Sequence, residues 1–211
     1  MSIKNKKTFK HSYNLELDNN RCSCGPGSDG ELVKKSGTIE FINNIIKKYK
    51  IKSISDCPCG LFENWMRFVD LTNVKYTGYD INDLAIERNK KNNPDLSFFE
   101  FDIVDDKLPY ADLVICRDCL FHLPDSFVLG AIENFYNSGS AYLLATDYSW
   151  VEVNTDLTKE ELELECGFRF INLEIKPFNL GSTIEIHNEE VWREYEGGHN
   201  RQMALWRLKE K

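Results

Sequence analysis

Residues 53–80 read SISDCPCGLFENWMRFVDLTNVKYTGYD, and this stretch decides the fold. It begins with a short apolar run, breaks at a turn that contains Pro58 and Gly60, and continues through apolar residues at helical spacing. A second apolar run then ends at Asp80. The order of strand, turn, helix and strand predicts one unit of a parallel α/β sheet.

The same stretch predicts a ligand site. In open α/β sheets, ligands lie beyond the carboxyl ends of the strands, and an acidic residue about 20 positions after the first glycine binds ribose hydroxyls. Asp80 stands 20 positions after Gly60. Gly60 is the one glycine where a dinucleotide fingerprint has three, so the pattern favours a nucleoside without phosphates. The plainer alternative is an ordinary strand-to-helix turn followed by a solvated aspartate.

The rest of the chain repeats the alternation of strand and helix signals. Apolar runs typical of strands occupy residues 53–57, 75–81, 96–103, 111–116 and 141–146, and helical patterns occupy 38–50, 62–69, 83–91 and 125–136, with Thr38 as the expected cap of the first helix. Later signals are weaker: a charged helix at 158–165 and strands at 170–175 and 202–208. We therefore expect a doubly wound α/β fold, with a mostly parallel seven-stranded sheet, helices on both faces and a final antiparallel pair of strands.

Composition limits the class of protein. The 211 residues are 42% hydrophobic, which is enough for one domain with one substantial core. The net charge of −8 repels phosphate backbones, so we expect no nucleic-acid partner. No apolar run is long enough to span a bilayer, and seven cysteines, several inside strand-like runs, fit a reducing compartment. We therefore expect a cytoplasmic protein with no membrane partner; its oligomeric state is not predicted.

Several motifs together resemble a known family. They are the turn Asp56-Cys57-Pro58-Cys59-Gly60, the strand ends Tyr79-Asp80-Ile81 and Phe101-Asp102-Ile103, and the run Leu113-Val114-Ile115-Cys116-Arg117-Asp118-Cys119-Leu120-Phe121-His122-Leu123. This combination is similar to class I S-adenosylmethionine-dependent methyltransferase-like proteins. The likeness extends to Gly25-Pro26-Gly27-Ser28, Pro177-Phe178-Asn179-Leu180 and Leu205-Trp206-Arg207-Leu208, although residues 61–65 hold one residue more than the family pattern.

The resemblance implies a Rossmann-like methyltransferase fold with S-adenosylmethionine as cofactor, and it implies a division of the single domain 1–211. Residues 1–37 would form an N-terminal arm, 38–147 the cofactor-binding core, and 148–211 the acceptor side. In the core, the implied cofactor contacts are Asp56, Pro58 and Gly60 beside the methionine part, Asp80 with Ile81 at the ribose, Asp102 and Ile103 at the adenine, and Cys116 with Arg117 after the fourth strand.

Asp118 and His122 are the candidate catalytic residues. They lie four positions apart, so both side chains would project the same way if a helical turn begins there. Methyl transfer to a hydroxyl needs alignment and a base for the acceptor proton, and histidine has an ordinary pKa near neutrality. The expected activity is methyl transfer to a small-molecule acceptor, with a hydroxyl on a sugar or sugar nucleotide preferred. The structural alternative is that Asp118 pairs with Arg117 and His122 caps a loop.

Three alternatives remain open from the sequence. Cys57, Cys59, Cys116 and Cys119 end neighbouring strands and can in principle bind zinc, but strand cysteines more often pack as small hydrophobic residues, so we expect no metal. A nicotinamide-dependent oxidoreductase is disfavoured by the missing phosphate-binding glycines. A non-catalytic binding module of the same fold is supported by that glycine-poor first motif.

Overall fold

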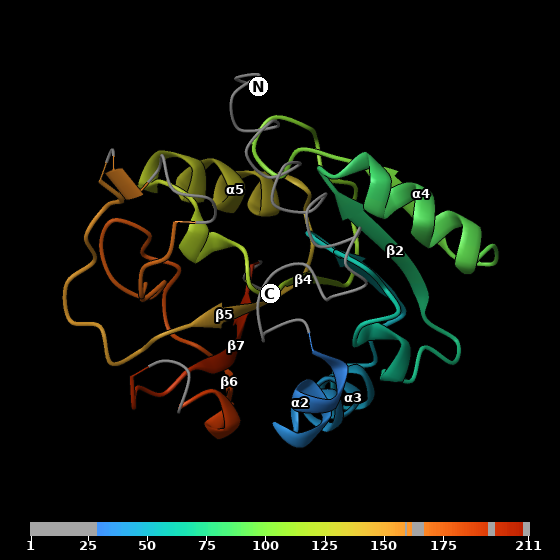
Figure 1. The fold of residues 1–211 in the computed structure, drawn as a ribbon, viewed down its shortest axis with the longest axis horizontal. Helices are drawn as coiled ribbons and strands as arrows, with labels where there is room; N and C mark the ends of the chain where they lie inside the picture. The colour runs from blue at the N-terminus through green and yellow to red at the C-terminus, as the bar shows by residue number, and fades with distance from the viewer. Residues whose placement is uncertain (1–28, 159, 162–166, 194–196, 209–211) are drawn as a thin grey trace.

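The computed structural model describes residues 29–158, 160, 161, 167–193 and 197–208 (Figure 1). Within them, seven strands form one sheet in the order β3-β2-β1-β4-β5-β7-β6. The strands are β1 (Ser53–Asp56), β2 (Lys75–Asp80), β3 (Ser97–Glu100), β4 (Leu113–Cys116), β5 (Tyr142–Asp147), β6 (Glu185–Asn188) and β7 (Gln202–Arg207). The helices are α2 (Gly30–Lys35), α3 (Thr38–Lys48), α4 (Asp83–Asn92) and α5 (Asp125–Asn137), with 3-10 turns η2 (Met66–Phe68), η3 (Leu120–His122) and η4 (Glu190–Trp192).

The sheet confirms the predicted doubly wound α/β fold. Strands β1 to β5 pair in parallel, whereas β7 pairs antiparallel with both β5 and β6. The antiparallel pair was expected, and the register shows that β6 runs in the same direction as β5. One edge of the sheet therefore gathers the carboxyl ends of six strands and the start of β7.

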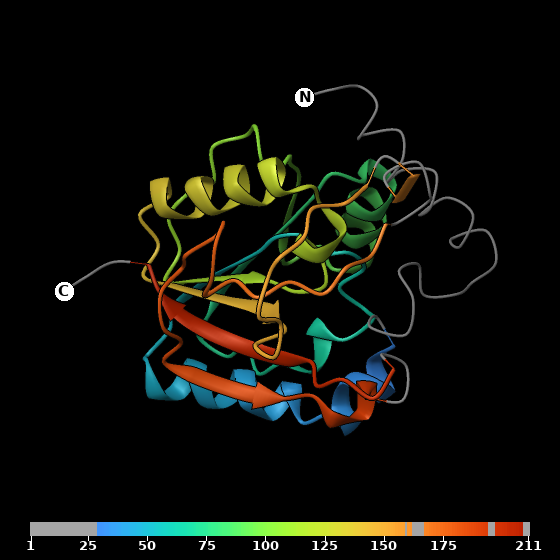
Figure 2. The same cartoon turned by 90° about the vertical axis from the view of Figure 1, so that its left-hand side faces the viewer.

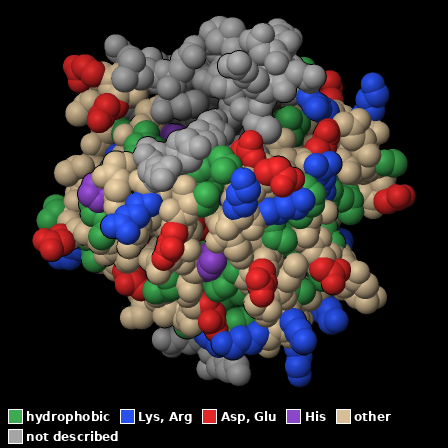
Figure 3. Space-filling model, turned by 60° about the horizontal axis from the view of Figure 1, so that its bottom comes forward, with side chains coloured by type: hydrophobic (Ala, Val, Ile, Leu, Met, Phe, Trp, Pro, Cys, Tyr) green, Lys and Arg blue, Asp and Glu red, His purple; other side chains and the backbone are tan. Residues whose placement is uncertain are grey.

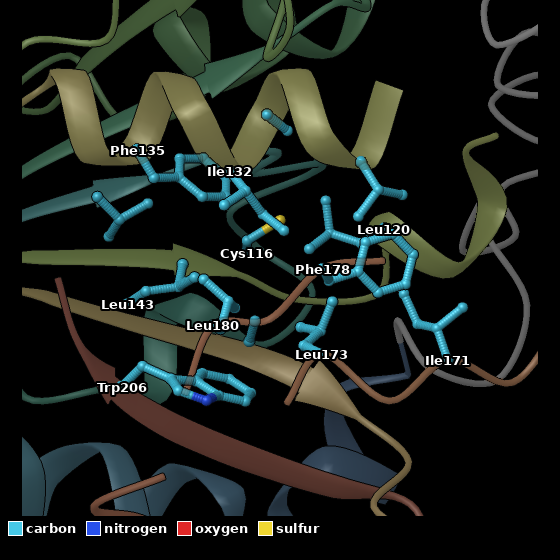
Figure 4. Packing of buried hydrophobic residues seen from close by; sticks show 14 of the residues in the cluster. Cys116, Leu120, Ile132, Phe135, Leu143, Ile171, Leu173, Phe178, Leu180 and Trp206 are labelled. Carbon is cyan, nitrogen blue, oxygen red and sulfur yellow. The ribbon is translucent and has the colours of Figure 1, made fainter. Parts of the chain in front are cut away.

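Two apolar layers hold helices against the two faces of the sheet, which confirms the prediction of helices on both faces. Alternate residues of β4 point to opposite layers: Val114 and Cys116 face α5, whereas Leu113 and Ile115 face Ile42 and its neighbours on α3. Figures 1 and 2 show α5 on one side of the central strands and α2 with α3 on the other. Figure 4 shows Ile132 and Phe135 of α5 above Leu143 and Trp206 of the sheet.

The predicted helix at 62–69 is wrong. Turns and the short η2 replace it, although Phe62, Trp65 and Met66 are buried as the helical spacing predicted. The buried Asn89 of α4 binds the backbone where this segment begins. Its amide donates to the Gly60 carbonyl at 2.7 Å, and its oxygen accepts from the Phe62 amide at 3.0 Å. Beyond this point backbone hydrogen bonds join residues three apart, Asn64 to Leu61 and Phe68 to Trp65, in place of the four-residue spacing of an α-helix.

The predicted strand at 170–175 is also wrong. Leu173 donates its backbone amide to Asp147 Oδ1 at 2.7 Å, and the Asn172 amide donates to Asn154 Oδ1 at 2.9 Å, so side chains replace a neighbouring strand. Ile171 and Leu173 pack into the layer under α5 (Figure 4). The strand that joins the sheet instead is β6, whose alternating half-buried and exposed residues gave no apolar signal.

Other local expectations are partly confirmed. The helices at 38–50, 83–91 and 125–136 are present as α3, α4 and α5, but Gly37 is the N-cap residue of α3 in place of Thr38. The last nine residues of the predicted arm include α2, capped by Asp29, whose Oδ1 accepts from two backbone amides. Residues 1–28, and most of the predicted helix at 158–165, lie outside the described residues.

Candidate functional site

The candidate site lies along the edge of the sheet where the parallel strands end. Asp56 ends β1, Asp80 ends β2 and Asp147 ends β5, while Arg117 follows β4 directly. All four side chains are buried. The sequence predicted the first two and Arg117 here, because apolar strands that end in a polar residue bring those residues to one edge.

Asp56 carries an unusual carboxyl group. Its Oδ2 accepts a hydrogen bond from the Tyr76 hydroxyl at 2.7 Å, whereas its buried Oδ1 has no partner among the described residues. Burial raises the pKa of Asp56 to about 7, against the Tyr76 hydrogen bond, which lowers it; Asp80 raises it further and Arg117 lowers it. A buried polar atom without a partner is costly, so it marks a place where a ligand can supply the missing hydrogen bond.

Asp80 closes the loop that follows β1. Its Oδ2 accepts from the Gly60 amide at 2.8 Å and its Oδ1 accepts from the Asn82 amide at 2.9 Å. Gly60 has a φ of 52°, in the left-handed region that glycine adopts without strain. Burial raises the pKa of Asp80 to about 6, although its backbone hydrogen bonds lower it. A carboxylate has about four acceptor sites, so Asp80 retains capacity for ribose hydroxyls.

Asn82 adds a second unpartnered atom beside Asp80. Its oxygen caps α4 by accepting from the Leu84 and Ala85 amides, but its buried Nδ2 has no partner within the described part of the chain. Ile81, between the two, is half-buried. Among the described residues, the site therefore offers Asp56 Oδ1 as an unpaired acceptor and Asn82 Nδ2 as an unpaired donor. A nucleoside joined to an amino acid carries both kinds of partner, so the residues present fit S-adenosylmethionine.

Asp102 and Ile103 follow β3 in a loop. Asp102 Oδ1 accepts from the Val104 amide at 2.9 Å, and the carbonyl of Ile103 accepts from Asn134 of α5 at 2.9 Å. Burial raises the pKa of Asp102. These contacts hold the loop over the end of the sheet beside β2. Their proposed contact with adenine stays a prediction.

Arg117 and Asp118 belong to a buried ion network that sequence reasoning only partly found. Arg117 donates to Asp118 Oδ2 at 2.8 Å and to Glu189 Oε1 at 3.2 Å. Arg201 donates to Glu189 Oε2 at 2.8 Å and to Asp118 Oδ1, which also accepts from the Thr146 hydroxyl at 3.0 Å. The predicted Arg117–Asp118 pair is present, but it is half of a four-membered network that closes on Glu189 and Arg201.

The network ties distant segments to the site. Glu189 follows β6 and also accepts from the Thr38 hydroxyl at the start of α3. Burial alone would raise the pKa of Glu189, but Arg201, Arg117 and the Thr38 hydrogen bond outweigh it and lower the pKa to about 2. Glu189 and Arg201 gave no sequence signal, because neither stands in a motif and their partners are far away in the chain.

His122 contacts the Gly167 carbonyl and the rings of Phe121 and Phe168. Asp118 has a φ of 55° and precedes η3, so the shared helical turn that would align it with His122 does not form. His122 Nδ1 lies 2.6 Å from the carbonyl oxygen of Gly167, which makes Nδ1 the protonated nitrogen of the neutral ring and Nε2 the basic one. The catalytic roles of Asp118 and His122 stay predictions.

His122 belongs to an aromatic group. This group is defined by rings in mutual contact from four segments at this end of the sheet: Phe121, His122, Tyr148, Trp150, Phe168, Phe170 and His199. Trp150 is 38% exposed and Phe168 is 41% exposed. His199 stacks on Trp150 at a centroid distance of 4.0 Å. In contrast, His187 bonds to the carbonyl of Ser36 through Nε2, away from this group.

The cysteines at the strand ends are buried or half-buried. Cys57 and Cys116 lie in the apolar layer under α5, where Figure 4 shows Cys116, and burial raises the pKa of both thiols. No cluster of three or more potential metal ligands occurs within the described ranges. Cys22, Cys24 and Cys166 lie outside them, so the expected absence of metal stays a prediction.

Surface charge and helix length bear on partners. On the face in Figure 3, basic and acidic side chains are interspersed among the residues drawn in colour. No helix in the described part of the chain is long and apolar enough to cross a membrane. The expectations of a small-molecule partner and of no nucleic-acid partner stay predictions.

Comparison with known proteins identifies the fold. Neither a protein-family model nor a curated protein sequence matches the chain. Among solved structures, N-methyltransferase NodS from Bradyrhizobium japonicum in complex with S-adenosyl-L-homocysteine is 14% identical, with a TM-score of 0.64 over 96% of this chain and 100% of that one. Magnesium protoporphyrin IX methyltransferase from Synechocystis with bound S-adenosylhomocysteine is 14% identical, with a TM-score of 0.67 over 96% and 98%.

A third similar structure is 1,6-didemethyltoxoflavin-N1-methyltransferase from Burkholderia thailandensis, which is 9% identical, with a TM-score of 0.65 over 98% of this chain and 88% of that one. At these identities the likeness shows the fold alone. The chain has the Rossmann-like fold of class I methyltransferases, as the resemblance implied.

Proposed function

We propose that this protein is an S-adenosylmethionine-dependent methyltransferase that acts on a small-molecule acceptor. The observation that carries the proposal is the pair of buried acids at the ends of the adjacent parallel strands β1 and β2. Asp56 leaves Oδ1 without a partner in the described ranges, and Asp80 joins the Gly60 loop to the start of α4. A site with this chemistry suits a ligand that brings both hydroxyl and ammonium donors.

Named residues would hold the parts of the donor. Asp80 would accept from the ribose hydroxyls, Asp56 would accept from the ammonium of the methionine part, and Pro58 and Gly60 would border that part. Ile81 would lie beside the ribose, Asp102 and Ile103 would flank the adenine, and Cys116 and Arg117 would lie beneath the donor at the end of β4. When bound, S-adenosylmethionine supplies an electrophilic methyl group on a sulfonium.

The acceptor side would be the aromatic group around His122. Trp150 and Phe168 are partly exposed, and they offer apolar surface against which a sugar or another small molecule can pack. His122 would take the acceptor proton through Nε2, because the Gly167 carbonyl holds the proton on Nδ1. A hydroxyl acceptor, on a sugar or sugar nucleotide, is therefore the acceptor class that we propose.

The oxidoreductase alternative loses further support from the backbone. A dinucleotide site places its pyrophosphate at the N-terminus of a helix that directly follows the first strand. Here turns and the three-residue η2 follow β1, and the next α-helix in the described chain is α4, after β2. A non-catalytic module has one specific observation in its favour: both oxygens of Asp118 are engaged by Arg117, Arg201 and Thr146.

Transfer of a labelled methyl group tests the proposal. The purified protein is incubated with labelled donor and a panel of sugar nucleotides and small hydroxylated metabolites, and the modified acceptor is then used to compare variants. His122→Ala should lower turnover about a hundredfold or more with little change in donor affinity. The matched control His187→Gln, a histidine bonded to Ser36, should keep full turnover.

Two outcomes contradict this account at different levels. Equal turnover of wild type and His122→Ala would remove His122 from the role of base. Binding of the donor without transfer to any acceptor would favour the non-catalytic module, and His122 would then be a structural residue of the aromatic group.

A further inference from the structure

The unpartnered oxygen of Asp56 calls for an explanation beyond its place in a family motif. Asp56 is fully buried at the end of β1, so neither of its oxygens gains from bulk water. Only Oδ2 has a partner, the hydroxyl of Tyr76 on the neighbouring β2. Buried carboxyl groups are normally satisfied, and one left half-satisfied reduces the stability of the fold. Such a group persists where a ligand completes it.

The surroundings of Asp56 decide which ligand group fits. From β2 it faces Tyr76 and Asp80, and from the residue after β4 it faces Arg117; Cys57, Cys59 and Cys116 are the nearby thiols. The thiols are neutral because burial raises their pKa values well above the ordinary range. Arg117 donates hydrogen bonds to Asp118 and Glu189. A cationic donor group is therefore the natural partner for Oδ1.

We propose that Tyr76 is a positioning residue for the methyl donor: its hydroxyl favours the ionised form of Asp56 and leaves the second carboxylate oxygen to bind the donor's ammonium group, so that donor binding converts the remaining protonated Asp56 to the carboxylate and releases its proton. This inference rests on the proposed function. The step balances as follows: the O–H bond of protonated Asp56 breaks, its proton passes to the buffer, and the ammonium donates an N–H to the unpartnered oxygen, Oδ1.

Tyr76 suits this role because a phenol donates to a carboxylate at any pH below its own titration. Burial raises the pKa of Tyr76 well above its ordinary value, so the hydroxyl keeps its proton. Loss of that hydroxyl would remove the described hydrogen bond that favours the ionised form of Asp56. The protonated form would then persist to higher pH, and the donor would have to displace a more tightly held proton.

Calorimetric titration with S-adenosylhomocysteine, which retains the ammonium group, tests the inference without need of an acceptor. Wild type and Asp56→Asn are titrated at pH 6.0 and pH 7.5, in two buffers of different ionisation enthalpy. Because the pKa of Asp56 is about 7, the affinity of wild type for S-adenosylhomocysteine should increase between these pH values by about eightfold more than the affinity of Asp56→Asn. Any titration of the ligand itself affects both proteins equally and therefore cancels in this comparison. Wild type should also release a fraction of a proton at pH 6.0 that Asp56→Asn does not.

Tyr76→Phe tests the positioning role, and Tyr79→Phe is its matched control. Tyr79 is a buried tyrosine on the same strand that packs in the apolar layer under α5, whereas Tyr76 packs in the opposite layer. Tyr76→Phe should bind about tenfold more weakly at pH 7.5 and shift the affinity midpoint to higher pH, whereas Tyr79→Phe should keep the wild-type profile. A purely structural Tyr76 would lower the melting temperature and leave the pH profile unchanged.

The outcomes separate this inference from the proposed function. If wild type binds S-adenosylhomocysteine with the same pH profile as Asp56→Asn or as a folded Tyr76→Phe, the proton-linked role is wrong and the donor site stands. If wild type does not bind the ligand at either pH, the donor site itself is wrong and the inference falls with it.

Discussion

Removal of the charge on Glu189 tests the buried ion network directly. Glu189 is fully buried, and its two oxygens accept from Arg117, Arg201 and Thr38. Glu189→Gln preserves the shape of the side chain but leaves two buried guanidinium groups with Asp118 as their one remaining carboxylate in the network. We therefore expect a large loss of stability from a change that keeps the number of heavy atoms in the side chain.

Two independent arguments give the magnitude. The pKa of Glu189 falls from its ordinary 4.5 to about 2, because Arg201 and Arg117 outweigh the effect of burial, and this difference corresponds to roughly 3 kcal/mol of stability. Removal of one partner from a buried ion pair typically costs about 3–5 kcal/mol. Because the pKa is lowered in the folded state, this stability is present above about pH 4.5 and is lost as the pH falls toward 2.

Urea unfolding at pH 7 is the assay, with Glu185→Gln as the matched control. Glu185 lies on the adjoining strand β6 and accepts from Lys48 and Tyr49, but its side chain is 25% exposed. Partly exposed pairs contribute about 1 kcal/mol or less, so the control should lose little. A loss for Glu189→Gln no greater than that of Glu185→Gln would refute the reasoning, as would a difference from wild type that does not shrink below pH 4.

Three further predictions concern the site. Asp80→Asn should weaken S-adenosylhomocysteine binding at least about tenfold in titration, because charge-assisted hydrogen bonds are worth roughly 1.5–3 kcal/mol; unchanged affinity in the folded variant would remove Asp80 from the site. Asp118→Asn should lower the melting temperature because of its place in the network, yet lower turnover less than His122→Ala does; the reverse order would make Asp118 the better base candidate. Elemental analysis should find no stoichiometric zinc or iron, and a chelator should leave the melting temperature unchanged. One metal ion per chain, whose removal unfolds the protein, would instead support a zinc site formed by the cysteines.

The sequence predicted the sheet well because its central strands are buried on both faces. All four residues of β4 are buried, and such continuous apolar runs are hard to mistake when turn residues bound them. The exposed edge strand β6 gave no such signal, since Ile186 is exposed and its neighbours along the strand are polar. The run at 170–175 is apolar but is not a strand. Ile171 and Leu173 belong to the apolar layer under α5 and do not join the sheet.

The sequence could predict the positions of those site residues that lie next to a strand in the chain, although their binding roles stay predictions. Asp56 and Asp80 stand directly at the ends of apolar strands, so their place at one edge follows from the chain order alone. Other residues of the site act through partners that are distant in the sequence: Tyr76 binds Asp56, Glu189 binds Arg117, and Arg201 binds Asp118. No spacing rule in the sequence links the members of these pairs. The segment 62–69 likewise has a distant partner, because the Asn89 side chain binds the backbone at Gly60 and Phe62.

Calorimetric titration of the wild-type protein with S-adenosylmethionine, S-adenosylhomocysteine and NAD is the most direct test of the central claim. A site built on Asp56 and Asp80 without a helix N-terminus for pyrophosphate should bind the first two with one site per chain and should not bind NAD. Binding of NAD alone would replace the methyl donor with a nicotinamide cofactor. Binding of none of the three would contradict the donor site and leave a methyltransferase fold that serves another purpose.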